Sequence, residues 1–459
     1  MREVAGRAAD LCGEMRNFAG RKPAIKPTAA AFVSTVSILP PPSIMIRTLL
    51  ILLSLLAMMA GCSDHDDALP GDGYPTETAP LPHGRRTVLV YMAMQNSLES
   101  YGCVRNDSLE LVRARAAVRP DDRLLVFIDD SRPPRLYRIG ADTEKPVRVH
   151  RWASEANSTS PVFLSSVLRL VRERYSADSY GLVIESHGDG WLPAIHPSAD
   201  AQPRLRSIGE DSMGDGDGNT TQMDLSALAD AITAAGIHMD YIFFDACLMQ
   251  TVEGAWALRH VTDHVIASPI AVPYSGADYE LQVNDGLFAD QPDRAIIDQY
   301  MRVADSDGMA LAAVCPARLD SLAAVLRRAL PSSPLAGRTS PDMSGVTTYQ
   351  GYGWKLNYRP YHFDAIEALQ HLLPDSTAAE ARRAIDYAVT YHAATDRVWI
   401  GPSVYNFARV NPNTTCSMAI FVPQSVYTSN AARCIYGDLN ACFARTAWYD
   451  AAGWQATGW

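Results

Sequence analysis

The sequence predicts an α/β protein built on a mostly parallel sheet. From residue 86 onward, short apolar runs alternate with longer amphipathic stretches, a pattern typical of strands joined by helices. With 459 residues, of which 47% are hydrophobic and 20% charged, the chain can bury a sizeable core in one large domain or two. The formal charge of −11 is spread along the chain without a basic stripe, so we expect no nucleic-acid partner.

The alternation can be followed in order along the chain. Apolar runs predict strands over residues 87–94, 124–129, 135–139 (an edge or hairpin strand), 181–185, 241–245 and 264–268. Apolar residues about one helical turn apart predict helices over residues 97–117, 161–175, 225–235 and 251–260. A second region continues the pattern, with helices over 294–302, 319–330 and 375–391 and strands over 309–314 and 417–422. Between these, the Ser- and Pro-rich residues 331–341 indicate a boundary or a long loop.

Two polar segments directly follow strand-like runs. Residues 186–191 (SHGDGW) follow the apolar run 181–185. Residues 245–249 (DACLM) begin at the last residue of the apolar run 241–245. Ligands bind at the carboxyl ends of strands in open α/β sheets, so both segments stand where chemistry is expected. A cysteine with an ordinary pKa of about 8.5 is mostly protonated at neutral pH, and a nearby imidazole can act as its base. The sequence therefore predicts a nucleophilic site formed by Cys247 and His187.

The order of the pair separates two kinds of cysteine enzyme. Papain-like proteases place the cysteine near the mature amino terminus and the histidine far downstream, whereas caspases place the histidine about 50 residues upstream of the cysteine. Here His187 precedes Cys247 by 60 residues. This arrangement excludes the papain order and favours the caspase order.

Further residues accompany the two segments. The residues that extend the pattern are Tyr91, Met92, Ala93, Asn96, Leu98, Glu253, Ser268, Gly276 and Tyr279. Residues 420–423 extend it more weakly. Together with the His-Gly and Asp-x-Cys motifs, this pattern resembles the clostripain family of cysteine peptidases. The resemblance implies a caspase-like three-layer α/β/α sandwich with a mostly parallel central sheet and an additional C-terminal α/β region. We expect residues 86–290 to form the catalytic domain and residues 291–459 to complete or flank it.

The resemblance also implies roles for individual residues. Cys247 matches the nucleophile, and His187 matches the general base that later protonates the leaving amine. The backbone amides of Gly188 and Cys247 would stabilise the oxyanion. Asp245 matches the acidic residue at the base of the specificity pocket, where it would pair with Arg or Lys of a protein or peptide substrate.

Each of these assignments has an alternative. Cys247 could be a buried core side chain, and His187 could be a satisfied turn residue in a Gly-rich loop. Asp245 could cap the next helix or hydrogen-bond the cysteine loop, and Trp191 could be a pocket wall that contacts substrate or an aromatic anchor for its own loop. The whole chain could be a catalytically inactive surface binding protein that keeps the fold. A transamidase is a third alternative, because an amine can resolve the same thioester.

The acidic residues 211–219 (DSMGDGDGN) invite a calcium interpretation. The spacing of Asp215, Asp217 and Asn219 matches the opening of an EF-hand loop, but Thr220 stands where glycine is required and no glutamate follows at the twelfth position. We therefore expect no metal ligand set in the active site and no required cofactor, with calcium as the alternative to a solvated acidic turn.

The amino terminus predicts membrane attachment. Arg47 precedes an uncharged run over residues 48–60 that ends in Met-Ala-Gly-Cys62, which resembles the lipobox of bacterial lipoproteins. We expect Met45 to be the initiator after an upstream segment 1–44, residues 45–61 to be the signal peptide, and residues 62–85 to be a tether. The alternative is an ordinary signal sequence that ends near a cysteine. The acidic residues 63–67 are similar to the surface-export signal of Bacteroides-group lipoproteins or form a solvated linker, so the expected location is the outer membrane.

Overall fold

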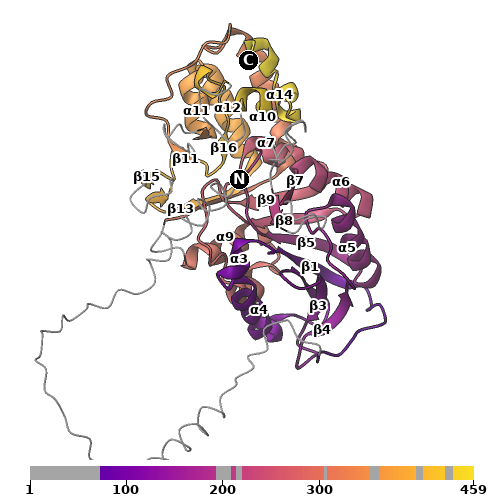
Figure 1. The fold of residues 1–459 in the computed structure, drawn as a ribbon. Helices are drawn as coiled ribbons and strands as arrows, with labels where there is room; N and C mark the ends of the chain where they lie inside the picture. The colour runs from indigo at the N-terminus through magenta and orange to yellow at the C-terminus, as the bar shows by residue number, and fades with distance from the viewer. Residues whose placement is uncertain are drawn as a thin grey trace, which may run out of the picture. The chain divides into compact units, whose positions relative to one another are not determined.

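The fold is organised around one large sheet (Figure 1). The structure, a computed structural model, describes residues 73–192, 208–212, 220–303, 308–350, 361–399, 407–428 and 438–459. Among these residues, nine strands form the sheet in the order β13-β10-β9-β8-β5-β1-β2-β3-β4. In chain order they are β1 (Gly84–Ala93), β2 (Asp122–Asp129), β3 (Arg135–Ile139), β4 (Val147–Arg151), β5 (Ala177–Glu185), β8 (Met239–Asp245), β9 (Thr262–Ala267), β10 (Ala310–Val314) and β13 (Val389–Ala394).

The centre of the sheet is parallel and its two flanks are antiparallel. β1 pairs in parallel with β2 and β5, and the parallel run continues through β8 to β9. At one flank β3 and β4 add as antiparallel strands, and at the other flank β10 and β13 do so. The carboxyl ends of β1, β2, β5, β8 and β9 therefore meet at one edge, as the sequence predicts.

Helices cover both faces of the sheet, because successive side chains along a strand point to opposite faces. On β1, Leu89 and Tyr91 pack into a core with α5 (Pro161–Arg174) and α6 (Leu225–Ala235). The alternate residues Val88 and Val90 pack into a second core with α4 (Cys103–Arg113) and α9 (Pro292–Val303). α5 and α6 lie side by side in Figure 1. The prediction of a caspase-like α/β/α sandwich with a mostly parallel sheet is confirmed.

Two helix predictions differ from the structure. The helix expected over 97–117 is interrupted, because Gly102 adopts a left-handed φ of 80° between α3 (Ser97–Ser100) and α4. The helix expected over 375–391 ends earlier, since α12 (Asp375–Ala388) is followed by β13. β3 is a hairpin strand, as one of the two alternatives for residues 135–139 predicts, and β4 forms the flank of the sheet beyond it.

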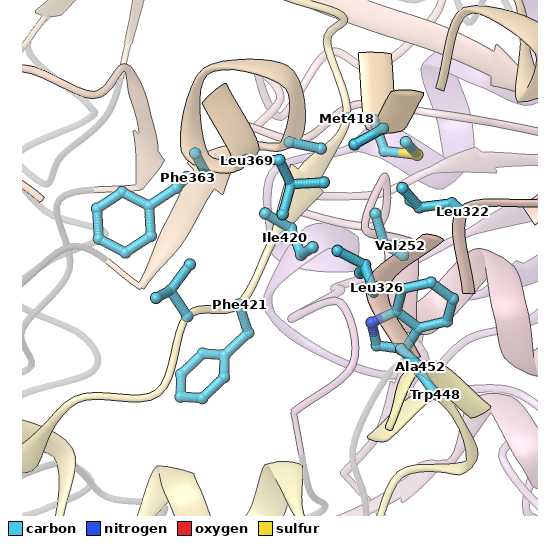
Figure 2. Close-up of a cluster of buried hydrophobic side chains, with 14 of the residues drawn as sticks. Val252, Leu322, Leu326, Phe363, Leu369, Met418, Ile420, Phe421, Trp448 and Ala452 are labelled. Carbon is cyan, nitrogen blue, oxygen red and sulfur yellow. The ribbon is translucent and has the colours of Figure 1, made fainter. Parts of the chain in front are cut away.

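A third core lies in the C-terminal region and reaches the cysteine segment. It gathers side chains from α7 (Val252–Ala257), α10 (Leu319–Ala329), α11 (Ala365–Leu372), α12, α13 (Leu439–Phe443) and α14 (Ala447–Ala452). Figure 2 shows Val252, Leu322 and Trp448 within this cluster. β16 (Ala419–Ile420) joins β12 (His362–Asp364) and β11 (Thr348–Gln350) in a small sheet, and it also bridges to Thr251 beside α7.

The amino-terminal predictions fall on residues that the structure does not describe. Cys62, the segments 1–44 and 45–61 and most of the tether lie outside the described residues. Within the described part of the chain, every helix is too short or too polar to cross a bilayer.

Candidate active site

The two polar segments leave neighbouring strands at the same height. β5 and β8 are parallel partners, and their last residues Glu185 and Asp245 face each other in register. His187 and Cys247 each follow that pair by two residues, and both are half-buried. Strand pairing therefore brings the predicted base and the predicted nucleophile to the same edge of the sheet.

Glycines allow the two loops to pack backbone against backbone. A Cβ atom on Gly188 would lie 2.7 Å from the carbonyl oxygen of Cys247 and 2.8 Å from the sulfur of Met249. A Cβ atom on Gly190, which has a φ of 68°, would lie 2.7 Å from the carbonyl oxygen of Leu248. Residues without a side chain are needed at both positions, since real Cβ atoms do not make such contacts.

Main-chain hydrogen bonds hold the Cys247 loop. Leu248 turns the chain with a φ of 64°, which is uncommon for a residue other than glycine. Its amide donates to Ile270 at 2.9 Å, and the Gln250 amide donates to Ser268 at 3.0 Å. The loop is thereby tied to the segment that follows β9.

The thiol of Cys247 is protonated at neutral pH in this arrangement. Burial raises its pKa to about 11, and the charges of Asp189 and Asp245 act in the same direction. The amide of Val272 donates to the sulfur at 3.4 Å, which opposes the shift without cancelling it. A base must therefore take the proton before this sulfur can act as a nucleophile.

The imidazole of His187 is held by the first residue of α3. Its Nε2 atom forms a 2.8 Å hydrogen bond with the hydroxyl of Ser97, which follows β1. Among the described residues, the hydrogen bonds of this imidazole and of the thiol go to Ser97 and Val272 rather than to each other. Catalytic hydrogen bonds are often long before substrate binds, so this geometry is compatible with a dyad.

The backbone of the His187 loop rests on β6 (Ile208–Asp211). The amide of Gly209 donates to the carbonyl of His187 at 3.0 Å. The amide of Glu210 donates to the hydroxyl of Ser186 at 3.1 Å, and that hydroxyl donates to Ala93 at 2.6 Å. The His187 loop thus lies between the end of β1 and the β6 segment.

Asp245, two residues before Cys247, is buried and accepts several hydrogen bonds. Its carboxylate accepts from the amide of Ala277 at 2.8 Å and from the hydroxyls of Tyr279 and Tyr300 at 3.2 Å each. Burial raises the pKa of the carboxyl, and these three donors partly offset the shift. The side chain is therefore a buried hydrogen-bond acceptor instead of a cap for the next helix, whose N-terminal cap is Thr251.

Two further acidic side chains surround Asp245. Asp107 on α4 and Glu185 at the end of β5 are buried and hydrogen-bonded to each other. Burial raises the pKa of Asp107 to about 7 and the pKa of Glu185 well above its ordinary value. Neither residue was predicted as part of the site, although Glu185 stands at the strand end two positions before His187.

Comparison with known proteins assigns the family. The sequence profile of the clostripain family matches residues 90–332, more than half of the chain. The chain belongs to the clostripain family. Clostripain of Hathewaya histolytica is 27% identical over 223 residues, which are 42% of this chain and 40% of that protein. The chain thus matches about two fifths of that relative's length.

Solved structures of family members have the same fold. The structure of a secreted C11 cysteine protease from Bacteroides thetaiotaomicron, bound to an irreversible peptide inhibitor, has a TM-score of 0.67 and 27% identity. The match covers 81% of this chain and all of that chain. An inactive zymogen C11 protease from Parabacteroides distasonis has a TM-score of 0.65 and 25% identity, with 81% and 99% coverage.

In this clostripain-family chain, the predicted residue Trp191 belongs to the C-terminal core. The structure buries Trp191 in the C-terminal core, with its ring 4.9 Å from that of Phe421 and 5.8 Å from that of Phe443. Trp191 is thus an anchor of the His187 loop. Asp215, Asp217 and Asn219 lie outside the described residues. Ser97 was not predicted, although its position directly after the first strand is the signal that could have found it.

Proposed function

We propose that this protein is a lipid-anchored cysteine endopeptidase that cleaves after Arg or Lys with a dyad of Cys247 and His187. The observation that carries the proposal is the matched register of the two loops. Each reactive side chain follows the paired residues Glu185 and Asp245 by two positions, and Gly188 packs against the carbonyl of Cys247. A protein with only a structural cysteine has no need of this juxtaposition.

The reaction proceeds through a thioester. His187 takes the proton of Cys247, and the thiolate attacks the carbonyl carbon of the scissile bond. The amides of Gly188 and Cys247 donate to the oxyanion of the tetrahedral intermediate. The intermediate collapses when His187 gives its proton to the leaving amine. Water, activated by His187, then attacks the thioester, which releases the acid product and restores the thiol.

The carboxyl group of Asp245 favours a basic residue before the cut. Asp245, Glu185 and Asp107 concentrate acidic groups below the nucleophile, and each influences the protonation of another. A guanidinium or ammonium group would replace the tyrosine hydroxyls as the partner of Asp245 and form a charge-assisted hydrogen bond. This pocket is the part of the proposal that a single substitution tests best.

The main experiment compares three forms of the purified protein on fluorogenic peptides with Arg, Lys or Ala before the reporter. We expect the parent to cleave the Arg and Lys peptides, Cys247→Ala to be inactive, and Cys315→Ala to cleave like the parent. Cys315 is the matched control, because it is also a half-buried cysteine after a strand. Equal rates for the parent and Cys247→Ala would refute the peptidase and favour the binding protein.

A second substitution tests the pocket. Asp245→Asn should lower kcat/KM for the Arg peptide about 100-fold, since loss of a charged hydrogen-bond partner costs about 1.5–3 kcal/mol. Thermal melting should show that the variant is folded. An unchanged ratio of Arg to Ala cleavage would refute the assignment of Asp245.

The lipid anchor is tested in cells. Labelled palmitate should enter the parent protein, and Cys62→Ser should abolish the label and move the protein from the membrane to the soluble fraction. Cys12→Ser should have no effect, because the proposal places residue 12 upstream of the initiator. Label in Cys62→Ser would refute anchoring at this residue.

A further inference from the structure

Two tyrosines from separate segments form an aromatic pair that the proposed reaction does not use. The ring centroid of Tyr274 lies 5.7 Å from that of Tyr101, with an angle of 42° between the ring planes. Tyr274 is 48% exposed, one of four large hydrophobic side chains that are exposed among the described residues. The same two segments carry the partly buried apolar side chains of Leu98 and Val272. The pair therefore presents apolar surface to solvent, which is typical of a binding site.

Tyr274 belongs to the segment that contacts the nucleophile. Val272, two residues earlier, donates its amide to the sulfur of Cys247 at 3.4 Å, and its carbonyl accepts from the thiol at 3.8 Å. Two residues span at most about 7 Å, so the backbone of Tyr274 lies within that distance of Val272. The same segment continues to Ala277, whose amide donates to Asp245. It thus connects the reactive sulfur with the carboxyl group that we propose binds the basic residue.

Tyr101 belongs to the element that holds the histidine. Ser97, the first residue of α3, hydrogen-bonds the imidazole of His187, and Tyr101 ends this helix four residues later. Side chains four residues apart on a helix lie on the same face. The aromatic pair therefore lies between the His187 side of the active site and the Cys247 side.

Hydrogen bonds fix the main chain around Tyr274. Its carbonyl accepts from the thiol of Cys103 at 3.1 Å. The amide of Gly276 donates to the carbonyl of Pro273 at 3.0 Å and closes a turn that contains Tyr274. The turn packs directly on Asp245, since a Cβ atom on Gly276 would lie 2.6 Å from its Oδ2 atom. A surface whose backbone is already ordered loses less conformational entropy when a peptide binds.

We propose that Tyr274 and Tyr101 form a subsite for a large apolar side chain of the peptide substrate, at the residue immediately before the basic residue. Successive side chains of an extended peptide point to opposite sides. The basic side chain points inward to the buried Asp245, so the preceding side chain points outward, where half of Tyr274 is exposed. An aliphatic or aromatic side chain would cover this ring, and its burial would favour binding. The assignment of the position rests on the proposed function.

Hydrolysis is measured on the full chain with fluorogenic peptides Ala-Ala-Xaa-Arg, in which Xaa is Gly, Leu or Phe. We expect the parent to favour Leu and Phe over Gly by about 10-fold or more in kcat/KM, mainly through KM. Tyr274→Ala should abolish most of this preference, whereas Tyr274→Phe, which keeps the ring, should retain it. Tyr387→Ala removes another exposed tyrosine, on α12, and should show the preference of the parent. Thermal melting should show that each variant is folded.

Binding is measured separately in the Cys247→Ala protein, so that it does not depend on hydrolysis. Fluorescence anisotropy with labelled Ala-Ala-Leu-Arg and Ala-Ala-Gly-Arg should show about 10-fold tighter binding of the Leu peptide. Adding Tyr274→Ala to this protein should remove most of the difference, and adding Tyr387→Ala should not.

The outcomes separate this subsite from the peptidase itself. An equal Leu-to-Gly ratio in the parent and Tyr274→Ala would overturn the subsite, whether or not the protein hydrolyses peptides. A change in the Arg-to-Ala ratio at the residue before the cut, with the Leu-to-Gly ratio intact, would place Tyr274 beside the basic residue and also overturn it. Leu-dependent binding through Tyr274 by a protein that hydrolyses none of the peptides would refute the proposed function and leave the subsite supported.

Discussion

The loops that carry Cys247 and His187 leave their strands at the same height but are held in different ways. The Cys247 loop is tied by main-chain bonds to Ser268 and Ile270, and the Gln250 carbonyl accepts from Ala419 of the C-terminal region. The His187 loop depends on the side chain of Ser186, on β6 and on Ser97. The Cys247 loop is thus held by main-chain bonds, while the position of His187 depends on side-chain hydrogen bonds and on a short segment.

The largest loss of activity is expected at Gly188, where the His187 loop contacts the Cys247 loop. Gly188→Ala would place a Cβ atom 2.7 Å from the carbonyl oxygen of Cys247 and 3.1 Å from the Cβ of Ala246. The loops must then separate, and a misplacement of about 1 Å can cost roughly 100-fold in rate. We expect kcat/KM for the Arg peptide to fall by about that factor. Gly73→Ala, whose Cβ meets nothing within 4 Å, is the control. A rate within twofold of the parent would show that the loops are not in contact.

A smaller loss of activity is expected when a substitution disturbs the His187 loop and leaves the Cys247 loop unchanged. Ser186→Ala removes the hydroxyl that donates to the carbonyl of Ala93 and accepts from the amide of Glu210. The substitution should lower kcat about 10-fold. It should also lower the free energy of unfolding by about 1–3 kcal/mol, since buried groups lose their partners. Labelling of Cys247 by iodoacetamide should be unchanged. If labelling slowed as much as hydrolysis, the two loops would not be independently held.

The hydrogen bond between Ser97 and the imidazole of His187 should contribute less to activity. Ser97→Ala removes one hydrogen bond to Nε2 of His187, so we expect kcat to fall about threefold to fivefold with KM unchanged. Ser100→Ala is the control, because its exposed hydroxyl donates to the main-chain carbonyl of Ser97 and leaves the Ser97 side chain in place. A rise in KM alone would assign Ser97 to substrate binding.

The smallest effect on activity, but a clear effect on stability, is expected at Glu253 behind the Cys247 loop. Its carboxyl accepts from the amide of Phe421 at 2.9 Å, and burial raises its pKa to about 8. Because the folded state holds this proton more tightly than the unfolded state, stability should decline as the pH rises from about 5 to above 8. Glu253→Gln cannot ionise, so it should reduce this decline by an amount on the order of 1 kcal/mol.

Denaturant unfolding at pH 6 and pH 9 measures this contribution. The difference in the free energy of unfolding between the two pH values should be smaller in Glu253→Gln than in the parent. An equal difference in both proteins would show that Glu253 is already ionised in the folded state.

Much of the fold follows from local patterns. The helix predicted over 225–235 has the same bounds as α6, and the central strands appear where the apolar runs predict them. Predictions failed where one or two residues changed the local preference. Gly102 divided one helix, and the β-branched residues Val389 and Thr390 began a strand that pairs with β10. No local pattern could show that β10 needs this antiparallel partner.

Local patterns in the sequence show that a histidine and a cysteine follow two buried strands, because apolar runs and the residues after them are local features. The pairing of β5 with β8 in register, which places the two residues together, is a long-range feature that appears in the folded chain. Folding also brings Ser97 to the imidazole and Tyr101 to Tyr274, which are far apart in the chain. Such contacts depend on strand order and helix packing, which no short stretch of sequence specifies.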